Sequence, residues 1–236
     1  MKRFTRDTTS AALALLLFSV SVTPIRGLDW YSLYVTAMPT WIYNGFTVDA
    51  EGEPVQGSDV SPLRMTFGIG ADLRLAERHR LEPQIWIYLQ EYAALREFDK
   101  TVPTQIETGA VVADIANTLS VALSIPWLYS LPWPASEDWT VALGGGLALI
   151  FRIPIQDIDG TDGSAVGGYW IDGRFVYPQV NVNVDYRLND RYEIGGGVEW
   201  FIPVYNAWAQ SEEAPFLDET MVRAGVRLRY LFPAAP

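Results

Sequence analysis

The chain has 236 residues, a formal net charge of −11, 49% hydrophobic residues, 9 tryptophans and no cysteine. This length suits a single domain. The acidic balance disfavours nucleic acid as a partner, because phosphates bind Lys and Arg. The lack of cysteine excludes disulfides, thiolate metal sites and a lipoprotein acyl anchor.

The N-terminal segment has the order of a secretory signal peptide. Lys2, Arg3 and Arg6 precede an uncharged apolar run over residues 11–22, which is too short to cross a bilayer as a permanent helix. We therefore expect a signal peptide over 1–27 and a mature domain over 28–236. An uncleaved anchor or a buried helix is the alternative for the first segment.

Strict alternation of apolar and polar residues marks the rest of the chain as strands with two different faces. The last strand shows it most clearly, since Val222, Val226 and Leu228 alternate with arginines. We expect strands at 31–38, 63–75, 81–91, 105–127, 139–153, 175–188, 192–204 and 221–232.

The connections alternate in length. Long polar connections are expected at 39–62, 94–104, 154–174 and 205–219, tight turns at 77–80 and 189–190, and an intermediate connection at 128–138 with an aromatic cluster of Trp127, Tyr129, Trp133 and Trp139. This pattern predicts an all-β fold, an eight-stranded antiparallel transmembrane up-and-down β-barrel with both termini at the short-turn end.

The alternation alone does not say which face points inward. A soluble periplasmic lipocalin-like carrier has about eight strands with the apolar face inside, and a soluble sandwich shares the same periodicity. Three features favour a membrane barrel: the polar face mixes both charge signs with glycines, the long strands approach the ~10 residues needed to span, and aromatic residues gather near strand ends.

The signal segment, the meander and the closing sequence at 226–232 resemble the small outer-membrane barrels of the OmpX, OmpA and OmpW type. The resemblance covers the whole mature chain and implies a location in the bacterial outer membrane, with outer-membrane lipid around the barrel. It also implies that Phe232 is the C-terminal aromatic residue read by the barrel-assembly machinery. Residues 233–236 follow Phe232 and depart from that pattern.

With the apolar face outward, charges of both signs point into a narrow lumen, where isolated charges would be costly. We therefore expect a salt-bridge network that plugs the lower barrel, with Glu193 pairing with Arg227 and Glu199 with Arg223. Inward glycines, such as Gly70 and Gly144, would make room for long Arg and Glu side chains or ease the coiling of the barrel. The expected network comprises Arg64, Asp72, Arg74, Glu82, Asp185, Arg187, Glu193, Glu199, Arg223, Arg227 and Arg229.

Aromatic residues are expected to project into the lumen nearer the long loops. They would either line a pocket for a small hydrophobic ligand or fill the upper barrel as packing. The set is Tyr34, Trp86, Tyr88, Tyr92, Phe175, Tyr177 and Phe201.

Acidic residues gather in the long loops. Asp157, Asp159 and Asp162 form a weak calcium candidate, but their spacing does not match an EF-hand, so we expect no metal and no cofactor. The loops 39–62 and 205–219 are expected to be solvent-exposed and available for surface contacts. Their acidic residues are Asp49, Glu51, Glu53, Asp59, Glu212, Glu213, Asp218 and Glu219.

The sequence offers little support for a catalytic site. A lipid-modifying outer-membrane enzyme with a Ser–His pair needs both groups within hydrogen-bond reach, and the single histidine, His79, falls in a predicted periplasmic turn. We expect no enzymatic activity, but a structural or surface-interaction role or a narrow passage for small hydrophobic molecules. We do not expect general diffusion, because water-filled porins need about sixteen strands.

Overall fold

The computed structural model describes residues 29–43, 46–48, 54–56, 63–95, 100–103, 114–132, 138–157, 164–171, 173–207 and 216–233. The predicted signal peptide lies outside these residues. Among them, no helix combines the length and the apolar character required to span a bilayer.

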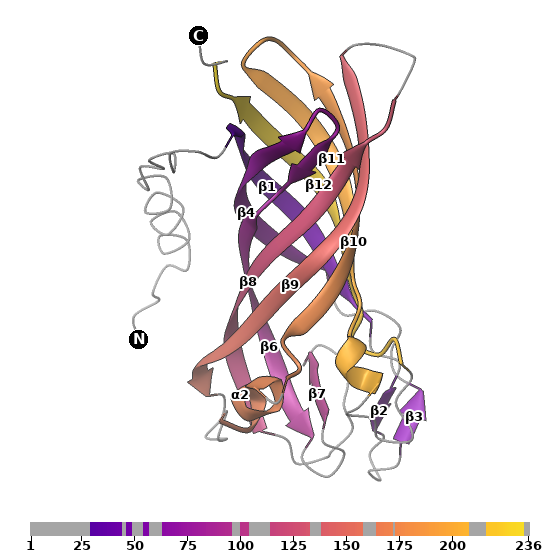
Figure 1. Ribbon diagram of the computed structural model, residues 1–236. Coiled ribbons are helices and arrows are strands. Elements are labelled where there is room, and N and C mark those ends of the chain that lie inside the picture. Colours follow the sequence, from indigo (N-terminus) through magenta and orange to yellow (C-terminus); the bar gives the residue numbers. More distant parts are fainter. Residues whose placement is uncertain are drawn as a thin grey trace, which may run out of the picture.

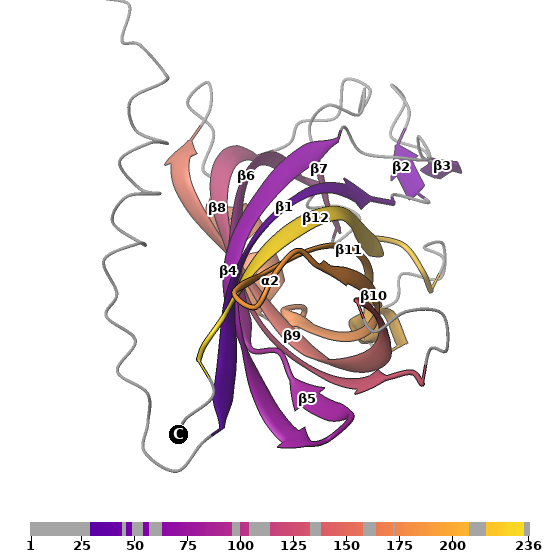
Figure 2. The same ribbon diagram turned by 90° about the horizontal axis from the view of Figure 1, so that it is seen from above.

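Long antiparallel strands close into a barrel, as predicted (Figure 1, Figure 2). The first strand of the ring pairs with both the second and the last, which removes the free edges of the sheet. Eight strands form the ring. They are β1 (Trp30–Ile42), β4 (Arg64–Ala76), β6 (Gln84–Leu95), β8 (Asp114–Ser130), β9 (Trp139–Asp157), β10 (Val176–Arg187), β11 (Tyr192–Phe201) and β12 (Met221–Leu231).

Short elements decorate the two ends of the ring. At the long-loop end lie β7 (Lys100–Pro103), the helix α2 (Ser164–Ile171) and the 3-10 helix η2 (Val204–Ala207). The hairpin of β2 (Phe46–Val48) and β3 (Pro54–Gln56) lies at the same end (Figure 1). The last short strand, β5 (His79–Leu81), lies at the short-turn end, where it pairs with β4 and β8.

Several predicted boundaries were wrong. β1 and β9 each run four residues further than expected, to Ile42 and Asp157, and the predicted 154–174 loop contains α2. The early part of the predicted 105–127 strand, 105–113, lies outside the described residues. Two glycines give α2 low helix propensity; the helix is stabilised by tertiary packing, because Val166 and Trp170, four positions apart, are both buried.

The two faces of the barrel are chemically opposite. Polar and charged side chains of the ring are buried inside, whereas apolar side chains are exposed outside, so the lipocalin-like alternative is wrong. An outward apolar belt on an even-stranded meander is the architecture of a bacterial outer-membrane barrel. The belt includes Val35, Phe67, Leu89, Leu123, Ile125, Leu143, Leu147, Ile153, Val180, Val182, Val198 and Leu228.

The inward glycines accommodate close neighbours. A Cβ atom at Gly70 would overlap the ring of Tyr34, and one at Gly144 would overlap the carbonyl oxygen of Trp127. Gly70 therefore makes room for an aromatic ring, where we had expected Arg or Glu. Gly144 permits the close approach of the β8 and β9 backbones that a small, strongly coiled barrel requires.

Candidate functional site

Charged side chains fill the short-turn half of the lumen. We call this cluster the ionic plug; its members come from β4, β5, β10, β11, β12 and the residues between β5 and β6. All are buried. The ionic plug consists of the cations Arg80, Arg227 and Arg229 and the carboxylates Asp72, Glu82, Asp185 and Glu193.

Arg229 is the centre of the ionic plug, because it reaches every one of these carboxylates. Its Nε lies 2.7 Å from Asp72 Oδ2, and its Nη2 lies 3.1 Å from Glu82 Oε1. Its Nη1 lies 3.0 Å from Asp185 Oδ2 and 2.9 Å from Glu193 Oε2. One guanidinium thus links β4, β10, β11 and the segment between β5 and β6 across the lumen.

The other arginines complete the cluster. Arg227 binds Asp185 through two parallel bonds, Nε to Oδ1 at 2.7 Å and Nη2 to Oδ2 at 2.5 Å, and reaches Glu82 at 3.1 Å. Arg80 Nε lies 2.8 Å from Glu82 Oε1. Such bidentate, charge-assisted bonds offset the cost of burying ions.

Neutral donors supply further bonds to the carboxylates of the ionic plug. The hydroxyl of Ser32 donates to Asp72, and Asn183 Nδ2 donates to Glu82 Oε2 at 3.2 Å. The ring centroid of Tyr34 lies 5.9 Å from Arg227 Cζ and 5.7 Å from Arg229 Cζ. Tyr34 therefore packs against the ionic plug, whereas we had placed it among the upper aromatic residues.

The structure corrects the membership expected from the sequence. Arg80, expected in a tight turn, lies in β5 and points inward, because only Glu77 and Arg78 form the turn. Arg74 is exposed and lies over the Tyr31 ring at 4.9 Å, since the end of β4 projects beyond the filled lumen. Arg187 has a side chain 53% exposed and contacts Glu193 at 3.4 Å.

A smaller polar cluster lies on the long-loop side of the ionic plug. Arg223 Nη1 lies 3.0 Å from Glu199 Oε2, the pairing expected from the sequence, while its Cζ lies 4.1 Å from the Trp86 ring centroid. Glu193 was expected to pair with Arg227. It pairs with Arg229 and Arg187 instead. Arg64, near the long loops, donates from Nε to Gln90 Oε1 at 2.8 Å.

Aromatic side chains around one buried cation close the long-loop end. We call this cluster the aromatic roof: Arg152 with Tyr92, Trp170, Tyr177 and Tyr205. Arg152 Cζ lies 3.6 Å from the Trp170 ring centroid, a cation–π contact. Its Nε donates to the Tyr92 hydroxyl at 3.2 Å and its Nη1 to the Tyr177 hydroxyl at 3.1 Å.

A chain of hydroxyl groups connects this cation to a carboxylate on the far side of the roof. The hydroxyls of Tyr177 and Tyr205 lie 3.2 Å apart, and Tyr205 donates to Glu219. Glu219 also accepts from the Tyr169 hydroxyl of α2 at 3.1 Å. Burial, and then the charge of Glu219, raises the pKa of Tyr169 well above its usual value, so this phenol stays a donor.

Glu219 holds an unusual backbone conformation. Its φ is 67°, a left-handed value that only a few per cent of non-glycine residues adopt. Both Asp218 and Glu219 are buried, so the expectation that they are exposed loop acids was wrong. The reason is that Glu219 tethers α2 and η2 to the mouth of the barrel through their tyrosines.

Most other predicted aromatic residues lie inside, and one does not. Trp86 and Phe201 are buried with ring centroids 5.5 Å apart, and Tyr88 is buried beside them. Phe175 is only half-buried and stacks at 5.6 Å on Phe151 of the outer face. It precedes the first residue of β10, so the alternation of that strand does not extend to it.

Arg152 is a further lumen residue that the sequence prediction missed. It is separated from Gly144 and Gly146 by an even number of residues on β9, so the alternation of that strand already predicted that its side chain points inward. Trp170 gave no such signal, because α2 was expected to be loop.

The docking of α2 depends on Trp170, and this can be tested. Trp170→Ala removes both the cation–π contact and the largest buried side chain of the helix. We expect α2 to undock and become cleavable by an added protease, as measured by limited proteolysis of the folded barrel. Ile171→Ala is the matched control, because Ile171 is 73% exposed. Equal cleavage of both variants would contradict the role given to Trp170.

The remaining predicted site residues are separate from the lumen. Of the calcium candidate, Asp157 is exposed, while Asp159 and Asp162 lie outside the described residues; within the described ranges no cluster of His, Cys, Asp and Glu has the make-up of a metal site. His79 stacks on Trp127 at 5.2 Å and contacts Tyr129 at 5.1 Å at the short-turn end. Phe232 is half-buried with its ring edge-on to Tyr230 at 5.9 Å.

No protein-family model matches the sequence, and no curated protein does. The structure is similar to that of the outer membrane protein OprG from Pseudomonas aeruginosa, with a TM-score of 0.48 and 10% identity over 89% of this chain and 100% of that one. It is also similar to Neisserial surface protein A, with a TM-score of 0.44 and 12% identity over 86% and 97%. A third similar structure is that of the outer membrane protein AlkL in lipid bilayers, with a TM-score of 0.42 and 10% identity over 90% of this chain and 95% of that one.

Proposed function

We propose that this chain is an outer-membrane barrel with a closed lumen, which serves a structural or surface-interaction role from its long-loop end. The ionic plug carries the proposal. Its three arginines and four carboxylates meet within one buried cluster. The formal sum of +3 and −4 is −1, so the cluster is nearly neutral and needs no mobile counter-ion to be stable.

The size of the barrel supports the same conclusion. An eight-stranded barrel has an interior just wide enough for side chains. Moving a hydrated ion past Arg229 would require its ionic contacts with four carboxylates to be disrupted in a low-dielectric interior. Removing one partner from a buried ion pair costs about 3–5 kcal/mol, which makes spontaneous opening rare.

The aromatic roof argues against a hydrophobic passage along the lumen. The space that the sequence suggested for a small hydrophobic ligand is occupied by the guanidinium of Arg152, which is 4% exposed. Its bonds to Tyr92 and Tyr177 hold it there. An apolar molecule would have to displace a buried cation, which is unfavourable without a replacement for its hydrogen bonds.

We also propose that the chain is not a Ser–His hydrolase. The single histidine, His79, is held between aromatic rings at the short-turn end, opposite the end that carries α2 (Figure 1). We further propose that Phe232 is the residue read by the barrel-assembly machinery. The deciding experiment for the closed lumen is single-channel conductance of the refolded barrel in a planar bilayer, where we expect no steady channels.

A further inference from the structure

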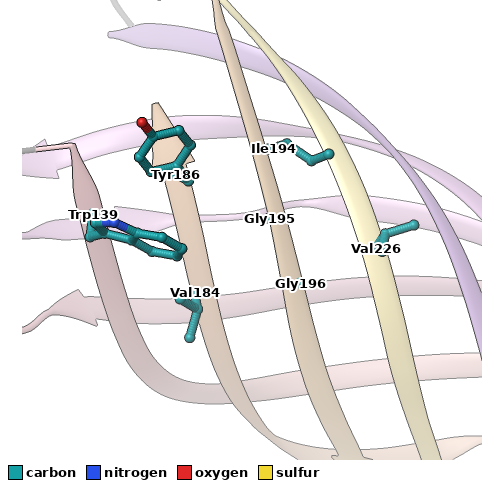
Figure 3. A pocket seen from close by; sticks show the side chains of 7 residues that line it. All are labelled: Trp139, Val184, Tyr186, Ile194, Gly195, Gly196 and Val226. Atoms are coloured by element: carbon teal, nitrogen blue, oxygen red, sulfur yellow. The ribbon is translucent and has the colours of Figure 1, made fainter. Parts of the chain in front are cut away.

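The outer face of the barrel is hollowed at one place near the short-turn end. The hollow, which we call the outer groove, has a volume of about 410 Å³. Figure 3 shows the side chains of β9, β10, β11 and β12 that surround it. They are Trp139, Val184, Tyr186, Ile194, Gly195, Gly196 and Val226.

The groove exists because Gly196 has no side chain on the lipid-facing surface. Val184 and Val226 are its neighbours on the two adjacent strands, and they stand on either side of the bare backbone. Trp139 and Tyr186 form the end of the groove nearest the short turns, with ring centroids 4.9 Å apart. The result is a slot with apolar walls, and the aromatic residues at its end occupy the usual interfacial position.

Charged residues of both signs lie just beyond these rings. Arg187 directly follows Tyr186 and therefore points to the lumen side of β10, where its Nη2 lies 3.4 Å from Glu193 Oε1, so it does not face the groove. Arg191 in the next turn is exposed and donates to the Tyr230 hydroxyl at 3.3 Å. Asp138 and Asp190 are exposed at the same end. An apolar slot that ends at an arginine and carboxylates complements an acyl chain that carries a zwitterionic head group.

We propose that the outer groove binds one acyl chain of a zwitterionic glycerophospholipid from the leaflet at the short-turn end. Its phosphate would lie at Arg191, and its ammonium group near the carboxylates. Arginine is suited to phosphate because its planar fork donates two parallel bonds. The inference rests on the membrane placement of the proposed function and is independent of whether the lumen is closed.

The test is native mass spectrometry of the full chain, extracted in mild detergent and incubated with palmitoyl-oleoyl phosphatidylethanolamine. Val184→Phe fills the groove from one of its side walls. Val180→Phe is the matched control, because Val180 is on the same face of β10, 46% exposed and outside the groove. We expect the wild type and Val180→Phe to retain one lipid, and Val184→Phe to bind it about tenfold more weakly.

Two further arms separate the outcomes. The variant Arg191→Gln should weaken binding of the phospholipid but not of a diacylglycerol with the same chains. Heat-dependent gel mobility verifies that each variant folds, so a loss of binding is not a loss of the barrel. Equal lipid retention by Val184→Phe and the wild type would overturn the proposal, and so would retention of lipopolysaccharide in place of phospholipid.

Discussion

Arg229→Leu is expected to lower the free energy of unfolding by about 3–5 kcal/mol, the usual cost of removing one partner from a buried ion pair. The wild-type guanidinium contacts Asp72, Glu82, Asp185 and Glu193 at 2.7–3.1 Å. Without it, these four carboxylates keep only Arg80, Arg227 and the weak contact of Arg187 with Glu193. Leucine retains much of the side-chain volume but carries no charge. The loss of stability would therefore reflect the missing ionic contacts and not a cavity.

The measurement is urea-induced unfolding of the barrel in lipid vesicles, followed by tryptophan fluorescence. Arg187→Leu is the control, because Arg187 is 53% exposed and has one weak ionic contact at 3.4 Å. Exposed ion pairs contribute about 0–1 kcal/mol, so this variant should unfold almost as the wild type does. If the Arg229 variant were as stable as the Arg187 variant, the ionic plug would not be a stabilising cluster.

Gly144→Ala is expected to destabilise the barrel by at least the ~1–3 kcal/mol typical of overpacking. Its new Cβ would overlap the carbonyl oxygen of Trp127 and lie 2.8 Å from the Cα of Leu128. Both atoms are backbone, so no rotamer change can relieve the clash. β8 and β9 would have to separate where Gly144 pairs with Leu128.

Gly168→Ala in α2 is the matched control. Gly168 is exposed, and a Cβ there would meet no atom within 4 Å. Alanine is favoured over glycine in a helix by roughly 0.5–1 kcal/mol, so this variant should fold at least as well as the wild type. The yield of refolded, heat-modifiable barrel compares the two. A Gly144→Ala barrel that folds with wild-type yield and stability would show that the close approach is not required.

The fold was predictable because alternation reports the two faces of a strand directly. The residues of β12 show this well: Arg223, Arg227 and Arg229 are buried and Val226 and Leu228 exposed, as their positions in the sequence required. Alternation fails where a strand ends. Arg80 and Phe175 were misplaced because each lies next to a turn, where the regular alternation of side chains ends or begins.

The pairing of charges was less predictable than their direction. Glu193 was expected to pair with Arg227, but the register places Glu193 opposite Arg229 and Gly195 opposite Arg227. A sequence fixes the face of a side chain, whereas its partner depends on how adjacent strands are staggered. The ionic plug was therefore predictable as a cluster but not as a set of bonds.

The aromatic roof was the least predictable part. α2 has two glycines, and its stability comes from Trp170 lying on Arg152. The tether at Glu219 depends on a positive φ that its neighbours impose. Tertiary contacts of this kind leave no periodic trace in the sequence.

Conductance tests the closed lumen most directly. The refolded barrel would be inserted in a planar bilayer, with insertion verified by heat-dependent gel mobility of the same preparation and a water-filled porin run as the positive control. The ionic plug and the aromatic roof predict a silent membrane at moderate voltage. Steady, voltage-independent channels that scale with salt concentration would contradict the closed lumen and show that ions pass Arg229.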